Sequence, residues 1–262
     1  MRISKIIPII LLILSLINEL VLPSDTTSVF SAGFRGHYGF IIPHSAAIEQ
    51  VSHTNPFGFE ISFSRFHRSY NKWQIFNAYW ISGIQSGAFD FQNPDILGMA
   101  YYVTVFAEPV IFYNKSNRII LSVRGGIGLS FHNKFYDRIE NPLNQFFSTG
   151  INFPLFVDLK LRHRIGQQNY LTLSGCYNHI SNGGFKQPNK GMNFPTLAIG
   201  FERFSKRIDE LNHSYSSSLR VERPGLTMMF QVLTAMKIVE ATDEMPEKAV
   251  FAFGLHSRLS KQ

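Results

Sequence analysis

The chain has 262 residues, of which 45% are hydrophobic, 14% are aromatic and only 16% are charged, with a formal net charge of +7. Soluble domains usually carry roughly 25% charged residues, so this composition is unusual for one. The single cysteine, Cys176, excludes an internal disulfide. A basic balance suits an anionic lipid surface as well as nucleic acid, but no basic helix, zinc pattern or single-strand-binding motif is present, so nucleic acid is not expected as a partner.

Residues 1–31 are predicted to be a signal peptide. Arg2 and Lys5 form a short basic region, residues 6–17 form an apolar core of signal-peptide length, and small residues follow around 28–32. The alternative is a membrane anchor that is retained, although the apolar run is short for a spanning helix.

Residues 32–262 are expected to form one domain built of β-strands. Apolar and polar residues alternate with period two, most clearly in the segment from Leu121 to Phe131, where every second residue is apolar or glycine. No long amphipathic helical pattern appears. Strands are predicted over 36–43, 57–66, 74–84, 98–112, 121–131, 153–161, 170–178, 194–204, 225–238 and 248–258.

These strands could form a soluble sandwich or a membrane barrel, and three features favour the barrel. An export signal precedes them, many are nearer the nine to eleven residues that cross a bilayer than the usual five or six, and aromatic residues gather at strand ends. We therefore predict an antiparallel transmembrane β-barrel of about eight strands, possibly ten, in the bacterial outer membrane. The aromatic residues expected at the membrane interfaces are Tyr79, Trp80, Tyr101, Tyr102, Phe112 and Tyr113.

A histidine and a serine lie two positions apart at the end of one predicted strand. Leu171, Leu173, Tyr177, His179 and Ser181 share a face by parity, and in a barrel that apolar face meets lipid. Placing polar side chains against the lipid chains costs free energy unless they have hydrogen-bond partners or lie near the lipid headgroups. A base beside a hydroxyl is the arrangement that activates a serine nucleophile, and a lipid substrate would explain its position.

The following loop and strand offer further candidate residues. Extending the parity of the 194–204 strand backward brings Asn193 to the same outer face, where it could orient the histidine. Asn182 could offer its side-chain amide or its N–H group to an oxyanion, Asn189 could brace the loop, and Gly183 would allow a tight chain path. The alternative is an ordinary hairpin, since Asn-Gly-Gly is a common turn sequence.

The run from His179 to Asn193, with its His-x-Ser-Asn start and its Lys-Gln-Pro-Asn-x-Gly continuation, resembles the lipid A 3-O-deacylase family of acyloxyacyl-hydrolase-like outer-membrane barrels. A weaker likeness extends over about 36–204, including residues 39–44. The resemblance implies a serine esterase that hydrolyses the ester-linked acyl chain at position 3 of lipid A, the membrane anchor of lipopolysaccharide. It implies Ser181 as nucleophile, His179 as base and Asn182 as oxyanion support, with no metal or organic cofactor.

The chain departs from the family pattern at Asn193, where well-studied members carry a glutamate. An amide can orient a histidine through its carbonyl oxygen but cannot stabilise the imidazolium by charge. The alternative function is therefore a barrel without catalysis, structural or a small pore, that keeps the scaffold with a defective triad. The nine histidines show no ligand spacing with cysteine or carboxylate partners, so no metal site is expected.

Overall fold

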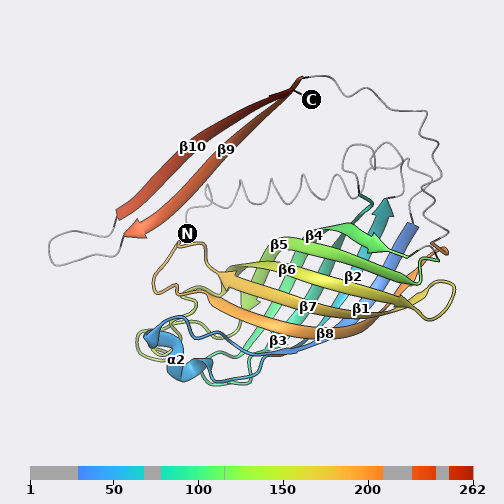
Figure 1. Cartoon of the computed structure of the whole chain (residues 1–262). Coiled ribbons are helices and arrows are strands. Elements are labelled where there is room, and N and C mark those ends of the chain that lie inside the picture. Colours follow the sequence, from blue (N-terminus) through green and yellow to red (C-terminus); the bar gives the residue numbers. More distant parts are fainter. Residues whose placement is uncertain (1–28, 68–77, 115, 209–225, 240–247, 262) are drawn as a thin grey trace. The chain divides into compact units, whose positions relative to one another are not determined.

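The computed structural model describes residues 29–67, 78–114, 116–208, 226–239 and 248–261. Eight antiparallel strands close into a barrel in the order in which they follow one another (Figure 1). These strands are β1 (Val29–Gly39), β2 (Phe57–His67), β3 (Trp80–Asp90), β4 (Met99–Tyr113), β5 (Ile119–His132), β6 (Ile151–Arg164), β7 (Asn169–Ser181) and β8 (Met192–Phe204). The prediction of an antiparallel barrel of about eight strands is confirmed.

Strands β1 and β8 close the barrel, with a register that runs from Ser31 opposite Phe204 to Gly39 opposite Thr196. The two remaining predicted strands do not contribute to this closure. They form a separate two-stranded antiparallel sheet of β9 (Leu226–Val239) and β10 (Lys248–Lys261). The barrel strands are 11 to 15 residues long, which suffices for tilted strands to cross a bilayer.

Strands β1 and β3 differ most from their predicted positions, and the other barrel strands differ by at most three residues at either end. Strand β1 starts at Val29 rather than at 36, within the last residues of the expected signal peptide. Residues 1–28 lie outside the described part of the chain, so the signal peptide stays a prediction. Strand β3 starts at Trp80 and continues to Asp90, beyond the predicted 74–84, of which residues 74–77 are also outside the description.

The barrel is apolar outside and polar inside, the reverse of a soluble sandwich. Strand β6 shows the pattern most clearly, because Val157 and Leu159 are 56% and 51% exposed, whereas Asp158 and Lys160 are 0% and 1% exposed. Exposed apolar side chains of this kind cover the outer face of the other barrel strands as well. The apolar parity therefore marks the surface that contacts lipid.

Buried ion pairs fill the middle of the barrel. Glu108 accepts a hydrogen bond from Arg124 Nε at 2.7 Å and pairs with Arg162, and Glu202 Oε2 lies 2.9 Å from Lys160 Nζ. Cations and anions occur in equal number in this network, which comprises Arg35, Glu60, Glu108, Arg124, Asp158, Lys160, Arg162 and Glu202. Each charge thus has an opposite charge beside it, as a buried site requires.

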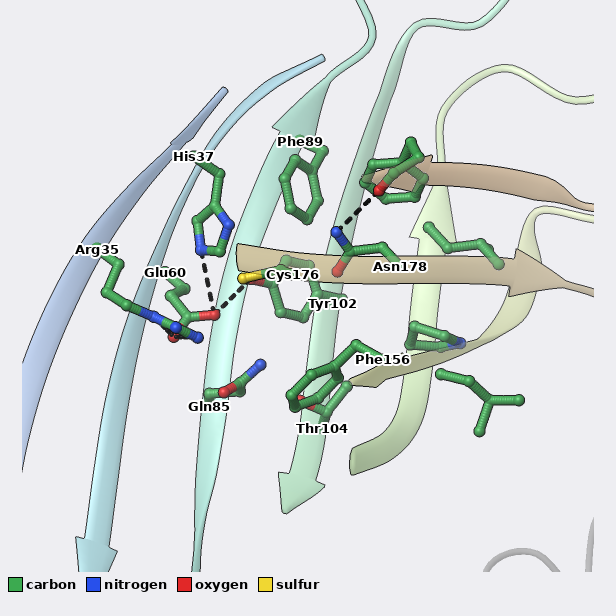
Figure 2. Close-up of a pocket in the computed structure, with 14 residues that line it drawn as sticks. Arg35, His37, Glu60, Gln85, Phe89, Tyr102, Thr104, Phe156, Cys176 and Asn178 are labelled. Carbon is green, nitrogen blue, oxygen red and sulfur yellow. Dashed lines mark hydrogen bonds and ion pairs between the residues drawn. The ribbon is translucent and has the colours of Figure 1, made fainter. Parts of the chain in front are cut away.

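Clusters of buried apolar residues close the barrel interior on both sides of the ion pairs. At one end, Phe66, Ile81 and Phe204 belong to a cluster from the strand ends. At the other end, Phe146 and Ile180 belong to a cluster that also includes residues of helix α2. A small interior cavity remains between Arg35, His37, Glu60 and the aromatic rings of Phe89, Tyr102 and Phe156 (Figure 2). Side chains therefore fill the barrel, as is usual for eight strands.

Helix α2 (Ala46–Ser52) lies in the β1–β2 connection, where Ser45 caps its start by accepting a hydrogen bond from the N–H of Ala47. Ile48 and Val51 on one face pack into the apolar cluster at this end of the barrel. The helix has seven residues. Within the described part of the chain, no helix is long and apolar enough to span a membrane.

The predicted aromatic girdles are only partly on the lipid-facing surface. Tyr101 and Phe112 are exposed, at 51% and 53%. Tyr79 and Tyr102 are buried, and the hydroxyl of Tyr102 donates to Glu60 Oε2 at 3.2 Å inside the barrel. Consecutive aromatic residues in a strand face opposite sides, so Tyr101 and Tyr102 could not both face lipid.

Candidate active site

The candidate site lies on the outer surface, where β7 ends and β8 begins. This is the end of the barrel that carries the connections 40–56, 91–98, 133–150 and 182–191, whereas the chain enters and leaves the barrel at the other end (Figure 1). Long connections are typical of the extracellular side of outer-membrane barrels. His179, Ser181 and Asn193 are half-buried there, on the apolar outward parity of their strands.

The barrel register places His179 directly opposite Asn193. His179 Nδ1 lies 2.7 Å from Asn193 Oδ1, so Nδ1 carries the proton and donates it to the amide oxygen. The other ring nitrogen, Nε2, then keeps its lone pair and can accept a proton. An amide oxygen thus selects the tautomer that a general base needs.

Ser181 lies beside the histidine without a hydrogen bond between them in the described residues. The side chains of His179 and Ser181 both lie close to Gly191. A β-carbon at Gly191 would be 2.9 Å from His179 Cε1 and 3.4 Å from Ser181 Cβ. The imidazole edge and the serine side chain therefore border the same small space. Nucleophile-to-base distances are often longer without substrate and shorten in the reacting complex.

Replacing Gly191 with alanine is expected to slow any reaction that uses His179 as base about tenfold to a hundredfold, because the methyl group would displace the imidazole ring. The φ angle of +69° adds backbone strain for any side chain. Gly184→Ala is the matched control, since Gly184 has a φ of +77° but open space at its β-carbon position. Steady-state rates of the two variants separate ring displacement from strain, and equal losses would contradict this explanation.

Asn182 is buried and engaged within the loop rather than pointing toward Ser181. Its side-chain amide donates to Ser148 Oγ at 2.9 Å and to the Lys186 carbonyl at 2.7 Å. Its own N–H donates to Asn189 Oδ1 at 3.1 Å, and its Oδ1 accepts from the Gly184 N–H at 2.9 Å. These contacts fold the turn around positive-φ glycines at 183 and 184 and tie it to the β5–β6 connection. In this arrangement the predicted oxyanion donors of Asn182 already have acceptors.

An apolar groove on the outer surface adjoins the catalytic candidates. Along β7 and β8, the row His179–Asn193 is followed by Tyr177–Pro195 and then by Gly175–Leu197. Gly175 has open space above it, and Leu159 of β6 lies on its other side. Tyr177, Pro195, Leu159 and Leu197 line the groove, which begins one register row away from the row of His179 and Asn193. The interior cavity of Figure 2 is a separate space, and His179, Ser181 and Asn193 are not among the residues that line it.

Interior carboxylates do not supply a triad acid. Glu202 and Asp158 are 2% and 0% exposed and are paired with cations inside the barrel. In the described residues, no group of three or more histidine, cysteine, aspartate or glutamate side chains is arranged to hold a metal ion. The acceptor at His179 Nδ1 is therefore the amide of Asn193.

Fold and surface define the class as an outer-membrane β-barrel protein, and His179, Ser181 and Asn193 lie on its lipid-facing side. The model of the family described as lipid A 3-O-deacylase (PagL) matches residues 54–202. This match covers more than half of the chain, so the chain belongs to the lipid A 3-O-deacylase family. No curated protein matches it.

Several solved structures are similar in fold. The outer-membrane enzyme PagL is 15% identical, with 64% of this chain and 97% of that chain covered and a TM-score of 0.43. Neisserial surface protein A (NspA) is 10% identical, with 66% and 96% covered and a TM-score of 0.44. Ail, the attachment invasion locus protein of Yersinia pestis, is 15% identical, with 68% and 97% covered and a TM-score of 0.33. These likenesses carry no functional argument, and the assignment rests on the family match.

Proposed function

We propose that this chain is an active lipid A 3-O-deacylase that works through Ser181, His179 and Asn193 at the outer leaflet. The observation that carries the proposal is the 2.7 Å contact from His179 Nδ1 to Asn193 Oδ1 on the lipid-facing surface. It gives the histidine the tautomer of a general base, beside a serine, where a lipid ester would lie. Family membership supports lipid A as the substrate.

In the proposed mechanism, Ser181 Oγ attacks the carbonyl carbon of the 3-O-linked acyl ester, while His179 Nε2 takes the serine proton. The tetrahedral intermediate collapses, the ester bond breaks, and His179 returns the proton to the departing 3-hydroxyl of lipid A. A water molecule then attacks the acyl-serine with His179 again as base, which releases the fatty acid and restores Ser181. The proposed oxyanion role of Asn182 requires the loop to release one of its amide hydrogens when substrate binds.

The proposal is tested with the purified full chain in mixed micelles with lipid A. One 3-O-linked fatty acid should be released per lipid A molecule, and lipid A that already lacks this chain should release none. Folding is checked by the altered electrophoretic mobility of the unheated barrel. A correctly folded protein that releases no fatty acid would exclude the deacylase and leave the structural barrel. The pore alternative is disfavoured, because ion pairs and apolar clusters fill the interior.

Asn193→Asp is expected to raise kcat by about tenfold or more. Aspartate has the same length as asparagine, so the 2.7 Å contact is preserved while a negative charge is placed beside the imidazolium that forms during catalysis. The gain should appear in kcat with little change in KM, since the charge acts mainly in the transition state. An unchanged kcat would contradict the orienting role of Asn193.

The apolar groove beside the site is proposed to hold the acyl chain that is removed. Gly175→Leu should raise KM for lipid A about tenfold by filling the groove, with little change in hydrolysis of a short soluble ester. Gly36→Leu on β1 is the matched control, because Gly36 also faces outward with open space but lies outside the groove. An equal effect of both variants would show that the groove does not hold the chain.

A further inference from the structure

His44, in the β1–β2 connection, contacts Asn193 with its imidazole ring. The ring nitrogen His44 Nδ1 lies 3.5 Å from Asn193 Nδ2, on the opposite end of the amide from His179. Asn193 therefore lies between two histidines, with its oxygen toward His179 and its nitrogen toward His44.

The direction of this amide matters for the proposed reaction. An asparagine has an acceptor end and a donor end, and both have nearly the same shape. With the oxygen toward His179, Nδ1 of that ring must carry the proton, so Nε2 is free to act as base. With the amide reversed, the nitrogen would donate to Nδ1, and the proton would move to Nε2, which is the wrong tautomer. A carboxylate has two equivalent oxygens and meets no such problem.

The contacts of His44 match the task of holding the amide in one direction. Its Nε2 lies 3.0 Å from the Lys190 carbonyl, which can only accept, so Nε2 carries a proton. The neutral ring then has a lone pair on Nδ1, and this nitrogen faces the amide donor of Asn193. The Ile42 carbonyl lies 3.2 Å from the same Nδ1, nearer than the amide nitrogen of Asn193 at 3.5 Å, and it too can only accept, so the proton is assigned to Nε2 on the shorter of the two carbonyl contacts. A neutral ring donates to only one of the two carbonyls, and the shorter contact is the one from Nε2.

We propose that His44 is a positioning residue that sets the tautomer of His179 by fixing the orientation of the Asn193 amide. This inference rests on the proposed function, because it gives the amide its catalytic task. It explains how a chain with asparagine in the position of a triad acid can keep a working base. The role is indirect, since His44 contacts Asn193 and the loop backbone rather than the substrate.

The first test measures the tautomer of His179 directly, without any reaction. The full chain, labelled with 15N-histidine in micelles, gives ring-nitrogen shifts that distinguish Nδ1–H from Nε2–H, and His179→Gln identifies the signals. We expect mainly Nδ1–H in the unsubstituted chain and a threefold to tenfold larger share of Nε2–H in His44→Ala.

His44→Gln should restore the original tautomer, because its side-chain oxygen can accept from Asn193. His53→Ala is the control from the same connection and should change nothing. An unchanged tautomer in His44→Ala would overturn the proposal.

The second test is a double-mutant cycle on deacylation. His44→Ala should lower kcat about threefold to tenfold when residue 193 is asparagine, and much less in the Asn193→Asp background, because a carboxylate needs no orientation. Equal losses in both backgrounds would overturn the positioning role. If the unsubstituted chain releases no fatty acid, the proposed function fails, while the tautomer measurement still decides the inference about His44.

Discussion

Ser181→Ala is expected to lower the rate of fatty acid release from lipid A by about a thousandfold or more. The alanine has no nucleophile, so only the positioning of ester and water near His179 would remain. Ser181 is the last residue of β7 and lies on the outward parity of that strand, opposite Phe153 of β6. The variant should therefore fold and insert as the unsubstituted chain does.

The rate is measured as fatty acid released per barrel in mixed micelles, at equal amounts of folded protein. His179→Gln should lower the rate of fatty acid release by a similar factor. The double variant should release fatty acid at the same rate as either single variant, because the two residues act as a unit. A Ser181→Ala variant that keeps more than a tenth of the rate would exclude Ser181 as the nucleophile.

Glu108→Gln is expected to destabilise the folded barrel by about 3 kcal/mol. The carboxylate is fully buried, accepts from Arg124 Nε at 2.7 Å and pairs with Arg162. The glutamine keeps the size of the side chain but leaves these two buried cations with less compensating charge. Unfolding by urea in lipid vesicles measures this change in the free energy of unfolding, because a less stable barrel is half unfolded at a lower urea concentration.

Glu140→Gln is the matched control, because Glu140 is exposed in the β5–β6 connection and should change stability by less than about 0.5 kcal/mol. The folded fraction of Glu108→Gln should keep its deacylation rate, since the interior network does not contact the outer site. An equal stability of the two variants would contradict the account of the interior as a charge-compensated core.

The sequence alone was sufficient to predict the barrel and the outer face of its most regularly alternating strands, although Tyr79 and Tyr102 are buried rather than at the membrane interface. Period-two alternation is local, and the apolar parity of the segment 153–161 became the lipid-facing side of β6. The same parity put His179 and Asn193 on one face, and the antiparallel pairing of the consecutive strands β7 and β8 made them neighbours in register. Hairpin geometry of this kind can be predicted because it depends on nearby residues.

Contacts between distant segments could not be predicted in this way. Asn182 carries a side chain suited to an oxyanion site, but its amide is engaged by Ser148 from the β5–β6 connection. No local pattern points to the approach of His44 to Asn193, which are separated by most of the barrel sequence. The start of β1 at Val29 was missed because small residues there also suit a signal cleavage site.

The most direct test of the central claim, that a lipid-facing Ser181, His179 and Asn193 remove the 3-O-linked chain of lipid A, is mass spectrometry of lipid A from expressing cells. Cells with the unsubstituted chain should yield lipid A lighter by one 3-O-linked hydroxyacyl chain, and cells with equal amounts of folded Ser181→Ala should yield unmodified lipid A. Unmodified lipid A from both, with the barrel folded in the outer membrane, would contradict the claim.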